Sequence, residues 1–114
     1  MDVFEMKFSK VYLLLIAKAI RKGRTAEEVH EVTSWLTGYS AGDLEGLLQS
    51  ESTYGDFLRN APVMNPARFQ IKGAVCGIRV ENIEDPTMRD LRILDKLVDD
   101  LAKGKPIEKI LPKA

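Results

Sequence analysis

The stretch DPTMRDLRILDKLVDDLAK, residues 85–103, is a long helical pattern that decides how the rest of the chain can fold. Asp85 and Pro86 form a typical helix start, and Gly104 is a typical end. The large apolar residues recur at steps of three and four and form one seam: Leu91, Leu94, Val98 and Leu101, widened by Ile93 and Leu97. Pairs of opposite charge stand four residues apart and are expected on the outer face: Asp85–Arg89, Lys96–Asp100 and Asp99–Lys103.

Three short helices are predicted upstream, because one capping pattern occurs three times within thirty residues. In each case a hydroxyl residue is followed three positions later by a carboxylate, so that each side chain can bond the backbone N–H of the other. The pairs are Thr25 with Glu28, Ser40 with Asp43, and Thr53 with Asp56.

The N-terminal region predicts another helix, capped by Ser9 and ending at about Lys22. Its middle, residues 11–17, is apolar on nearly every side, and such a helix is buried by its own domain or by a partner chain. The preceding residues 3–8 alternate in polarity and suggest a short strand or an extended arm.

Residues 66–80 are harder to assign. Asn65 and Pro66 form a good helix start, and we expect a helix from Pro66 to about Gly77. The glycines also fit an irregular strand over residues 69–80, so helix and strand both stay open.

Together these patterns predict an all-α, mostly helical fold: one compact domain over residues 1–114, with five or six helices and the two long helices at its centre. The longest apolar run has seven residues, too few to cross a membrane. A single cysteine and the absence of a signal-peptide pattern favour the cytoplasm.

Charge is balanced overall but unevenly placed along the chain. There are 17 basic and 17 acidic residues. Residues 1–24 carry six basic groups and two acidic ones, and residues 101–114 carry four and one, whereas the interior helices are acidic. The basic ends are expected to pack against acidic helices of this chain or of a second subunit. The alternative is a basic patch for an anionic partner.

The chain lacks the residue sets of common catalytic and metal sites. His30 and Cys76 are the only histidine and cysteine, so no metal site and no cofactor are predicted. His30 faces away from the stripe formed by Val29, Val32, Trp35 and Leu36 and is expected at the surface, whereas Cys76 is expected to be a small buried residue. The sequence therefore favours a non-enzymatic protein over an enzyme.

One low-molecular-weight ligand site is predicted where loops, a helix start and cations meet: Tyr39, Asn65, Arg68, Cys76 and Arg79. The free N–H groups after Asn65, beside Arg68, suit an anion. The helix after Ser40 is not expected to bind in a groove of DNA, because this helix carries the acidic residues Asp43 and Glu45 and no Lys or Arg.

Several stretches make the chain resemble the bacterial domain of unknown function 2200 family: Gly23-Arg-Thr-Ala-Glu-Glu-Val29, Trp35-Leu-Thr-Gly-Tyr-Ser40, Asn65-Pro66, Cys76-Gly-Ile-Arg-Val-Glu-Asn-Ile-Glu-Asp-Pro86, Leu94-Asp-Lys-Leu97 and Ala102-Lys-Gly-Lys105. The resemblance covers nearly the whole chain. It implies a small cytoplasmic bacterial protein of one domain, and it brings no catalytic residues.

Three functions stay open at this point. The first is a non-enzymatic interaction or structural protein that forms a homodimer. The second is a small-molecule or anion-binding protein, or an undetected enzyme, with a pocket near Asn65, Arg68 and Cys76. The third is weak nucleic-acid binding through the basic chain ends.

Overall fold

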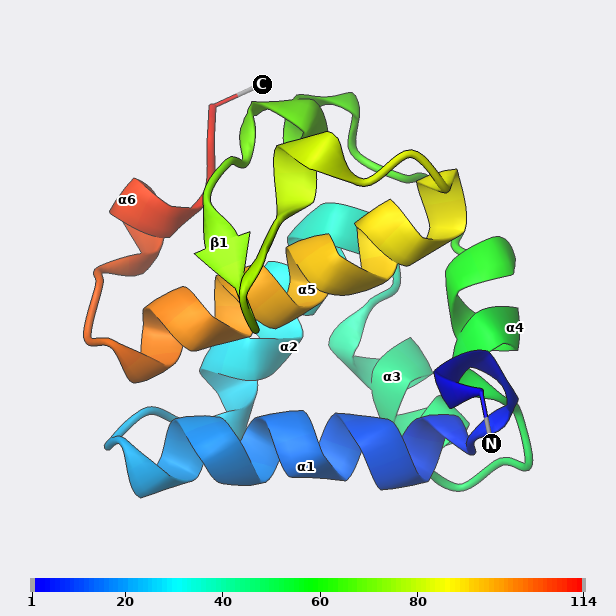
Figure 1. The fold of residues 1–114 in the computed structure, drawn as a ribbon. Coiled ribbons are helices and arrows are strands. Elements are labelled where there is room, and N and C mark those ends of the chain that lie inside the picture. The colour runs from blue at the N-terminus through cyan, green and yellow to red at the C-terminus, as the bar shows by residue number, and fades with distance from the viewer. Residues whose placement is uncertain (1, 114) are drawn as a thin grey trace.

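The computed structural model describes residues 2–113, and over this range the predicted mostly helical fold is confirmed (Figure 1). Six α-helices are present among these residues: α1 (Phe8–Arg21), α2 (Ala26–Thr37), α3 (Ala41–Leu48), α4 (Tyr54–Arg59), α5 (Pro86–Ala102) and α6 (Ile107–Ile110). The short 3-10 helix η1 (Val3–Glu5) precedes α1. Two further 3-10 helices and one hairpin lie between α4 and α5: η2 (Pro66–Gln70), β1 (Ala74–Val75), β2 (Ile78–Arg79) and η3 (Val80–Asn82).

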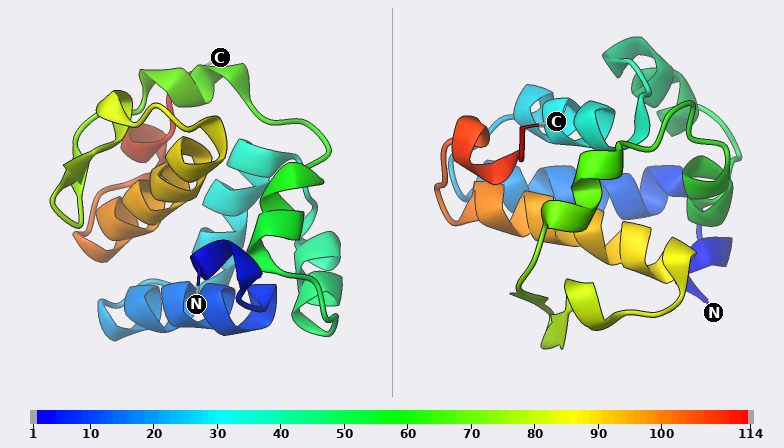
Figure 2. Two further views of the ribbon diagram at one scale, coloured as in Figure 1. Left: turned by 45° about the vertical axis from the view of Figure 1, so that its right-hand side comes forward. Right: turned by 90° about the horizontal axis from the view of Figure 1, so that it is seen from above.

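Helix α5 is the central element, as its apolar seam predicts. It lies along α1 and also contacts α2, α4, β1, η3 and α6 (Figures 1 and 2). All six seam residues are buried: Leu91, Ile93, Leu94, Leu97, Val98 and Leu101. The carboxylate of Asp85 accepts hydrogen bonds from the backbone N–H groups of Thr87 and Met88, which caps the helix.

All three predicted capping boxes are formed. In α2 the backbone N–H of Glu28 donates to Thr25 Oγ1 over 3.2 Å, and the N–H of Thr25 donates to Glu28 Oε1 over 3.1 Å. The starts of α3 and α4 repeat this pattern with Ser40 and Asp43 and with Thr53 and Asp56. Each cap contributes about 1 kcal/mol of helix stability, which matters most for helices this short.

An aromatic cluster joins α1 to α4. The ring of Phe8 stacks on Tyr12 with 4.7 Å between centroids, and the ring of Phe57 lies 4.6 Å from it. Tyr54 completes the cluster and is fully buried. Large buried rings dominate the packing energy of a small core, so this cluster fixes the N-terminal half of α1.

The expectations for the N-terminal region need correction. Helix α1 begins at Phe8 without a side-chain cap, and Ser9 lies inside it. The preceding residues form the turn η1 and a single β-bridge between Lys7 and Thr53, not a strand. Only one face of α1 is covered by the domain, and Leu13, Leu14 and Ile20 stay 54–63% exposed.

The helix expected over residues 66–77 is also wrong. Only Pro66–Gln70 is helical, as η2, and residues 74–79 form an antiparallel hairpin in which Val75 pairs with Ile78. Its two-residue loop is Cys76-Gly77, with φ values of +52° and +78°. Two successive positive φ values define the type I′ turn that matches the twist of a hairpin. This turn exposes Cys76, contrary to the expected buried thiol.

The charge pairs of α5 follow the prediction in part. Lys103 contacts Asp99 over 2.9 Å as expected. The guanidinium of Arg89 lies over the ring of Phe69, 5.0 Å from its centroid, and does not pair with Asp85. From residue 2 to residue 113, no helix is both long and apolar enough to cross a bilayer.

Candidate functional site

The predicted site residues Asn65 and Arg68 are in contact, but several of their polar atoms already have partners within the chain. Asn65 Oδ1 accepts the backbone N–H of Ala67 over 2.9 Å, which caps η2. Arg68 Nη1 donates to the carbonyl of Asn65 over 3.0 Å, and its Nε lies 2.8 Å from Asp90 Oδ1. An anion at this helix start would have to compete with Asp90.

The other three predicted residues lie elsewhere. Cys76 and Arg79 belong to the hairpin, and Arg79 Nε donates to Glu81 Oε2 over 2.8 Å. Glu81 Oε1 also accepts the backbone N–H of Gly73, a bond that lowers the pKa of Glu81 to about 2. The hydroxyl group of Tyr39 donates a hydrogen bond to the carbonyl of Phe57. Tyr39 lines a separate surface hollow together with Gly42, Asp43 and Pro62, and none of the other four predicted site residues lines that hollow.

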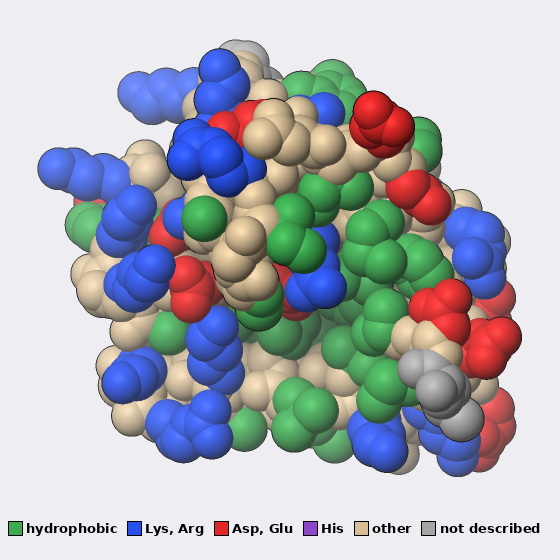
Figure 3. Space-filling view, viewed as in Figure 1, with side chains coloured by type: hydrophobic (Ala, Val, Ile, Leu, Met, Phe, Trp, Pro, Cys, Tyr) green, Lys and Arg blue, Asp and Glu red, His purple; other side chains and the backbone are tan. Residues whose placement is uncertain are grey.

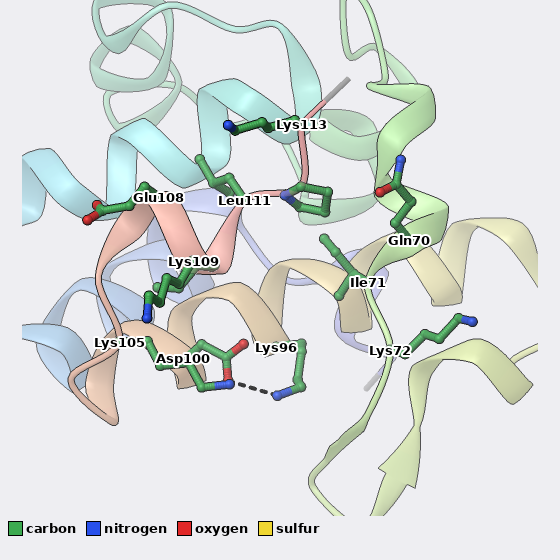
Figure 4. A pocket seen from close by; sticks show the side chains of 12 residues that line it. Gln70, Ile71, Lys72, Lys96, Asp100, Lys105, Glu108, Lys109, Leu111 and Lys113 are labelled. Atoms are coloured by element: carbon green, nitrogen blue, oxygen red, sulfur yellow. Dashed lines mark hydrogen bonds and ion pairs between the residues drawn. The ribbon is translucent and has the colours of Figure 1, made fainter.

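A basic hollow, here called the C-terminal pocket, lies between α5, the segment after η2 and the last nine described residues. Its volume is about 390 Å³. Seven charged side chains line it: Lys72, Lys96, Lys105, Lys109 and Lys113, with Asp100 and Glu108. In Figure 4, Lys109 extends toward Asp100, whereas Glu108 points away from it.

The floor of the C-terminal pocket is a buried ion pair, where the sequence predicted an exposed one. Lys96 Nζ lies 2.8 Å from Asp100 Oδ1, and both residues are 8% exposed. Lys105 Nζ approaches the same oxygen to 3.7 Å. The backbone of Gly73 packs on Lys96, since a Cβ there would lie 3.0 Å from Lys96 Cε. Helical spacing places Lys96 and Asp100 beside Ile93 and Leu97, and this signal could have revealed their burial.

The surface around this pocket is the basic end of the molecule. Figure 3 shows Lys and Arg side chains gathered where α6 and the C-terminal ends of α1 and α5 lie, and most visible Asp and Glu at the opposite end. Part of this basic charge is neutralised within the chain, because Lys18 Nζ lies 3.1 Å from Asp99 Oδ1. Arg24 joins α2 to the C-terminal segment by donating to Glu28 and to the carbonyls of Leu101 and Lys105.

A second hollow, here called the α2–α3 groove, has a volume of about 490 Å³ and is lined by Ala26, Glu27, His30, Glu31, Ser34, Ala41 and Glu45. His30 was expected at the surface, yet it is only 9% exposed. Its ring stacks on Tyr12, and Nδ1 lies 2.8 Å from the Tyr12 hydroxyl. The buried Thr33 and Thr37 widen the inner face of α2 toward His30. The predicted buried face of α2 contained apolar residues only. It left out these threonines, and His30 was therefore predicted to lie on the opposite, exposed side.

Among residues 2–113, no three His, Cys, Asp or Glu side chains converge as a metal ion requires.

The comparisons with known proteins agree with the sequence resemblance. Residues 2–112 match the family described as "Uncharacterized protein conserved in bacteria (DUF2200)". The chain is similar to the crystal structure of uncharacterized protein SP1917, with 54% identity, coverage of 96% of this chain and 92% of that one, and a TM-score of 0.92. No curated protein matches the chain. The chain therefore belongs to the DUF2200 family of conserved bacterial proteins.

Proposed function

We propose that this protein is a non-enzymatic binding protein that takes a small, multiply charged oxyanion in the C-terminal pocket. One observation carries the proposal: of the described residues that line this hollow, five are lysines and two carry carboxylates. Lys72 and Lys109 form no ion pair with any carboxylate of residues 2–113. Figure 4 shows the ammonium group of Lys109 directed toward Asp100 and that of Lys72 directed away from it, so Lys72 would have to change its side-chain conformation to meet a ligand.

The buried pair at the floor supports this assignment. Lys96 and Lys105 both approach Asp100, so the carboxylate at the floor repels an entering anion little. The lysines above it act as point charges of the kind that binds phosphate groups. Surface lysines are flexible and screened by salt, so we expect modest affinity that falls steeply with ionic strength.

Calorimetric titration with inorganic pyrophosphate tests the proposal. The double variant Lys72→Gln/Lys109→Gln should lose about tenfold in affinity, since each partly exposed ion contact is worth up to about 1 kcal/mol. Lys10→Gln/Arg21→Gln is the matched control: it removes two exposed cations of α1, outside the pocket. Equal losses of affinity in both variants would mean that pyrophosphate responds to the overall charge of the protein and does not bind in the pocket.

A second candidate function is self-association through the exposed face of α1, defined by Leu13, Leu14, Ala17 and Ile20. Within residues 2–113 six large hydrophobic residues stay exposed, and three of them lie on this helix. Figure 3 shows hydrophobic side chains in a band over the face that α1 and α5 share. A second copy of the chain is the partner that we propose, as a homodimer.

A further inference from the structure

We propose that the α2–α3 groove binds a small organic cation, a protonated amine with an apolar body, whose N–H group donates to His30 Nε2. The α2–α3 groove is separate from the C-terminal pocket, and its ligand is a cation. Three features support this assignment: a hydrogen-bonded chain that sets which nitrogen of neutral His30 carries the proton, the charge at the rim of the groove, and the apolar character of its wall.

The hydrogen-bonded chain runs from the interior of α2 to the groove. Thr33 Oγ1 donates to the carbonyl of Val29 over 2.8 Å, as a helical threonine does to the preceding turn. That hydroxyl can then only accept from Tyr12, whose oxygen lies 3.2 Å away. The Tyr12 oxygen also lies 2.8 Å from His30 Nδ1. Since we assign the one Tyr12 proton to Thr33, we assign the proton of this contact to His30 Nδ1.

A neutral imidazole with its proton on Nδ1 carries a lone pair on Nε2. No hydrogen bond to Nε2 is formed within residues 2–113, and Nε2 is not one of the fully enclosed, unpartnered atoms of this part of the chain. His30 itself is more than nine-tenths buried and lines the groove. The lone pair of His30 Nε2 therefore faces the groove, where it can accept a hydrogen bond from a ligand.

The rim of the groove supplies the complementary charge. Glu27 and Glu31 stand four residues apart on α2, and Glu45 faces them from α3. None of the three forms an ion pair with a described residue. Like charges four residues apart repel each other and destabilise a helix. A cationic ligand between Glu27 and Glu31 would relieve this repulsion. The carboxylates do not converge on one point, which suits an organic cation better than a metal ion.

The remaining wall suits the apolar part of the ligand. Ala26 and Ala41 present methyl groups from the two helices, and Ser34 adds one hydroxyl. A volume of about 490 Å³ lies within the range of small-molecule sites. These features favour a monoamine with an aromatic or alkyl body over a small inorganic cation.

The experiment uses phenethylamine and its neutral analogue, phenethyl alcohol, as probes of the full-length protein. We expect the amine to bind in calorimetry and to shift the ring signals of His30, the one histidine in the chain, whereas the alcohol does neither. Glu31→Gln should weaken amine binding roughly threefold to tenfold. Glu84→Gln, an exposed carboxylate outside the groove, should leave it unchanged.

A long-range proton–nitrogen correlation spectrum at alkaline pH tests the hydrogen-bonded chain separately. The His30 ring should carry its proton on Nδ1 in the free protein, and Tyr12→Phe should move it to Nε2. A proton on Nε2 in the unmodified protein would overturn the inference. So would equal binding of amine and alcohol, no binding of the amine, or equal effects of the two glutamate substitutions.

Discussion

Two buried tyrosines illustrate how a single hydroxyl group decides stability at the residue scale. Tyr12 and Tyr54 are both fully buried in the same aromatic cluster. The hydroxyl of Tyr12 has two partners, His30 and Thr33, whereas that of Tyr54 has none within residues 2–113. Burial raises the pKa of both phenols well above the ordinary value, so both are neutral.

Replacing each tyrosine by phenylalanine should therefore have opposite effects. Tyr54→Phe should raise the free energy of unfolding by about 1 kcal/mol, because it removes a buried polar group without a partner. Tyr12→Phe should lower it by about 1–3 kcal/mol, because it leaves His30 Nδ1 and Thr33 Oγ1 buried without their shared hydrogen-bond partner. Urea denaturation of the two variants measures both values. Equal destabilisation would contradict the difference in hydrogen bonding.

At the scale of elements, the sequence predicts what local spacing controls. The capping boxes and the seam of α5 depend on residues three or four apart, and all are found as expected. The hairpin and the burial of His30 depend on what packs from distant segments, which spacing along one helix does not contain. For the same reason the five predicted site residues do not share one hollow: Tyr39 lines its own, and Arg68 pairs with Asp90.

Substitutions in the hairpin turn test whether the local backbone conformation determines which residues are tolerated there. Cys76 adopts φ +52°, a left-handed conformation that asparagine tolerates better than other side chains. Cys76→Asn should raise the free energy of unfolding by about 0.5–1 kcal/mol, whereas the β-branched Cys76→Val should lower it by about 1–2 kcal/mol. Thermal or urea unfolding measures both. If valine is tolerated as well as asparagine, the turn is not of this type.

At the scale of the whole molecule, charge and apolar surface are both unevenly distributed. A chain of zero net charge has one basic end, and it leaves an apolar face on α1, the helix that its own domain covers on one side only. The basic end suits an anion, and the apolar face suits a second copy of the chain. The two surfaces can be tested independently because they use different residues.

Leu14→Glu should abolish self-association without unfolding the monomer, because Leu14 is 63% exposed and a carboxylate there would be buried in the dimer. Sedimentation velocity over a range of concentrations measures the oligomeric state. Val63→Glu is the matched control, since Val63 is 67% exposed and lies in the loop before η2. A wild-type protein that stays monomeric at all concentrations would contradict the proposed dimer.

The packing of α1 against α5 also has a consequence for synthesis on the ribosome. Arg21 ends one helix and Pro86 begins the other, so about 65 residues must be added before the partner of α1 begins to appear. At about 5–20 residues per second, this delay lasts roughly 3–13 s. During that time the inner face of α1, with Phe8, Tyr12 and Ile16, can be covered only by α2, α3 and α4, which are synthesised before α5, and Phe8 has its aromatic partner Phe57 in α4. The nascent chain is therefore most exposed to chaperones and to aggregation before residue 54 emerges.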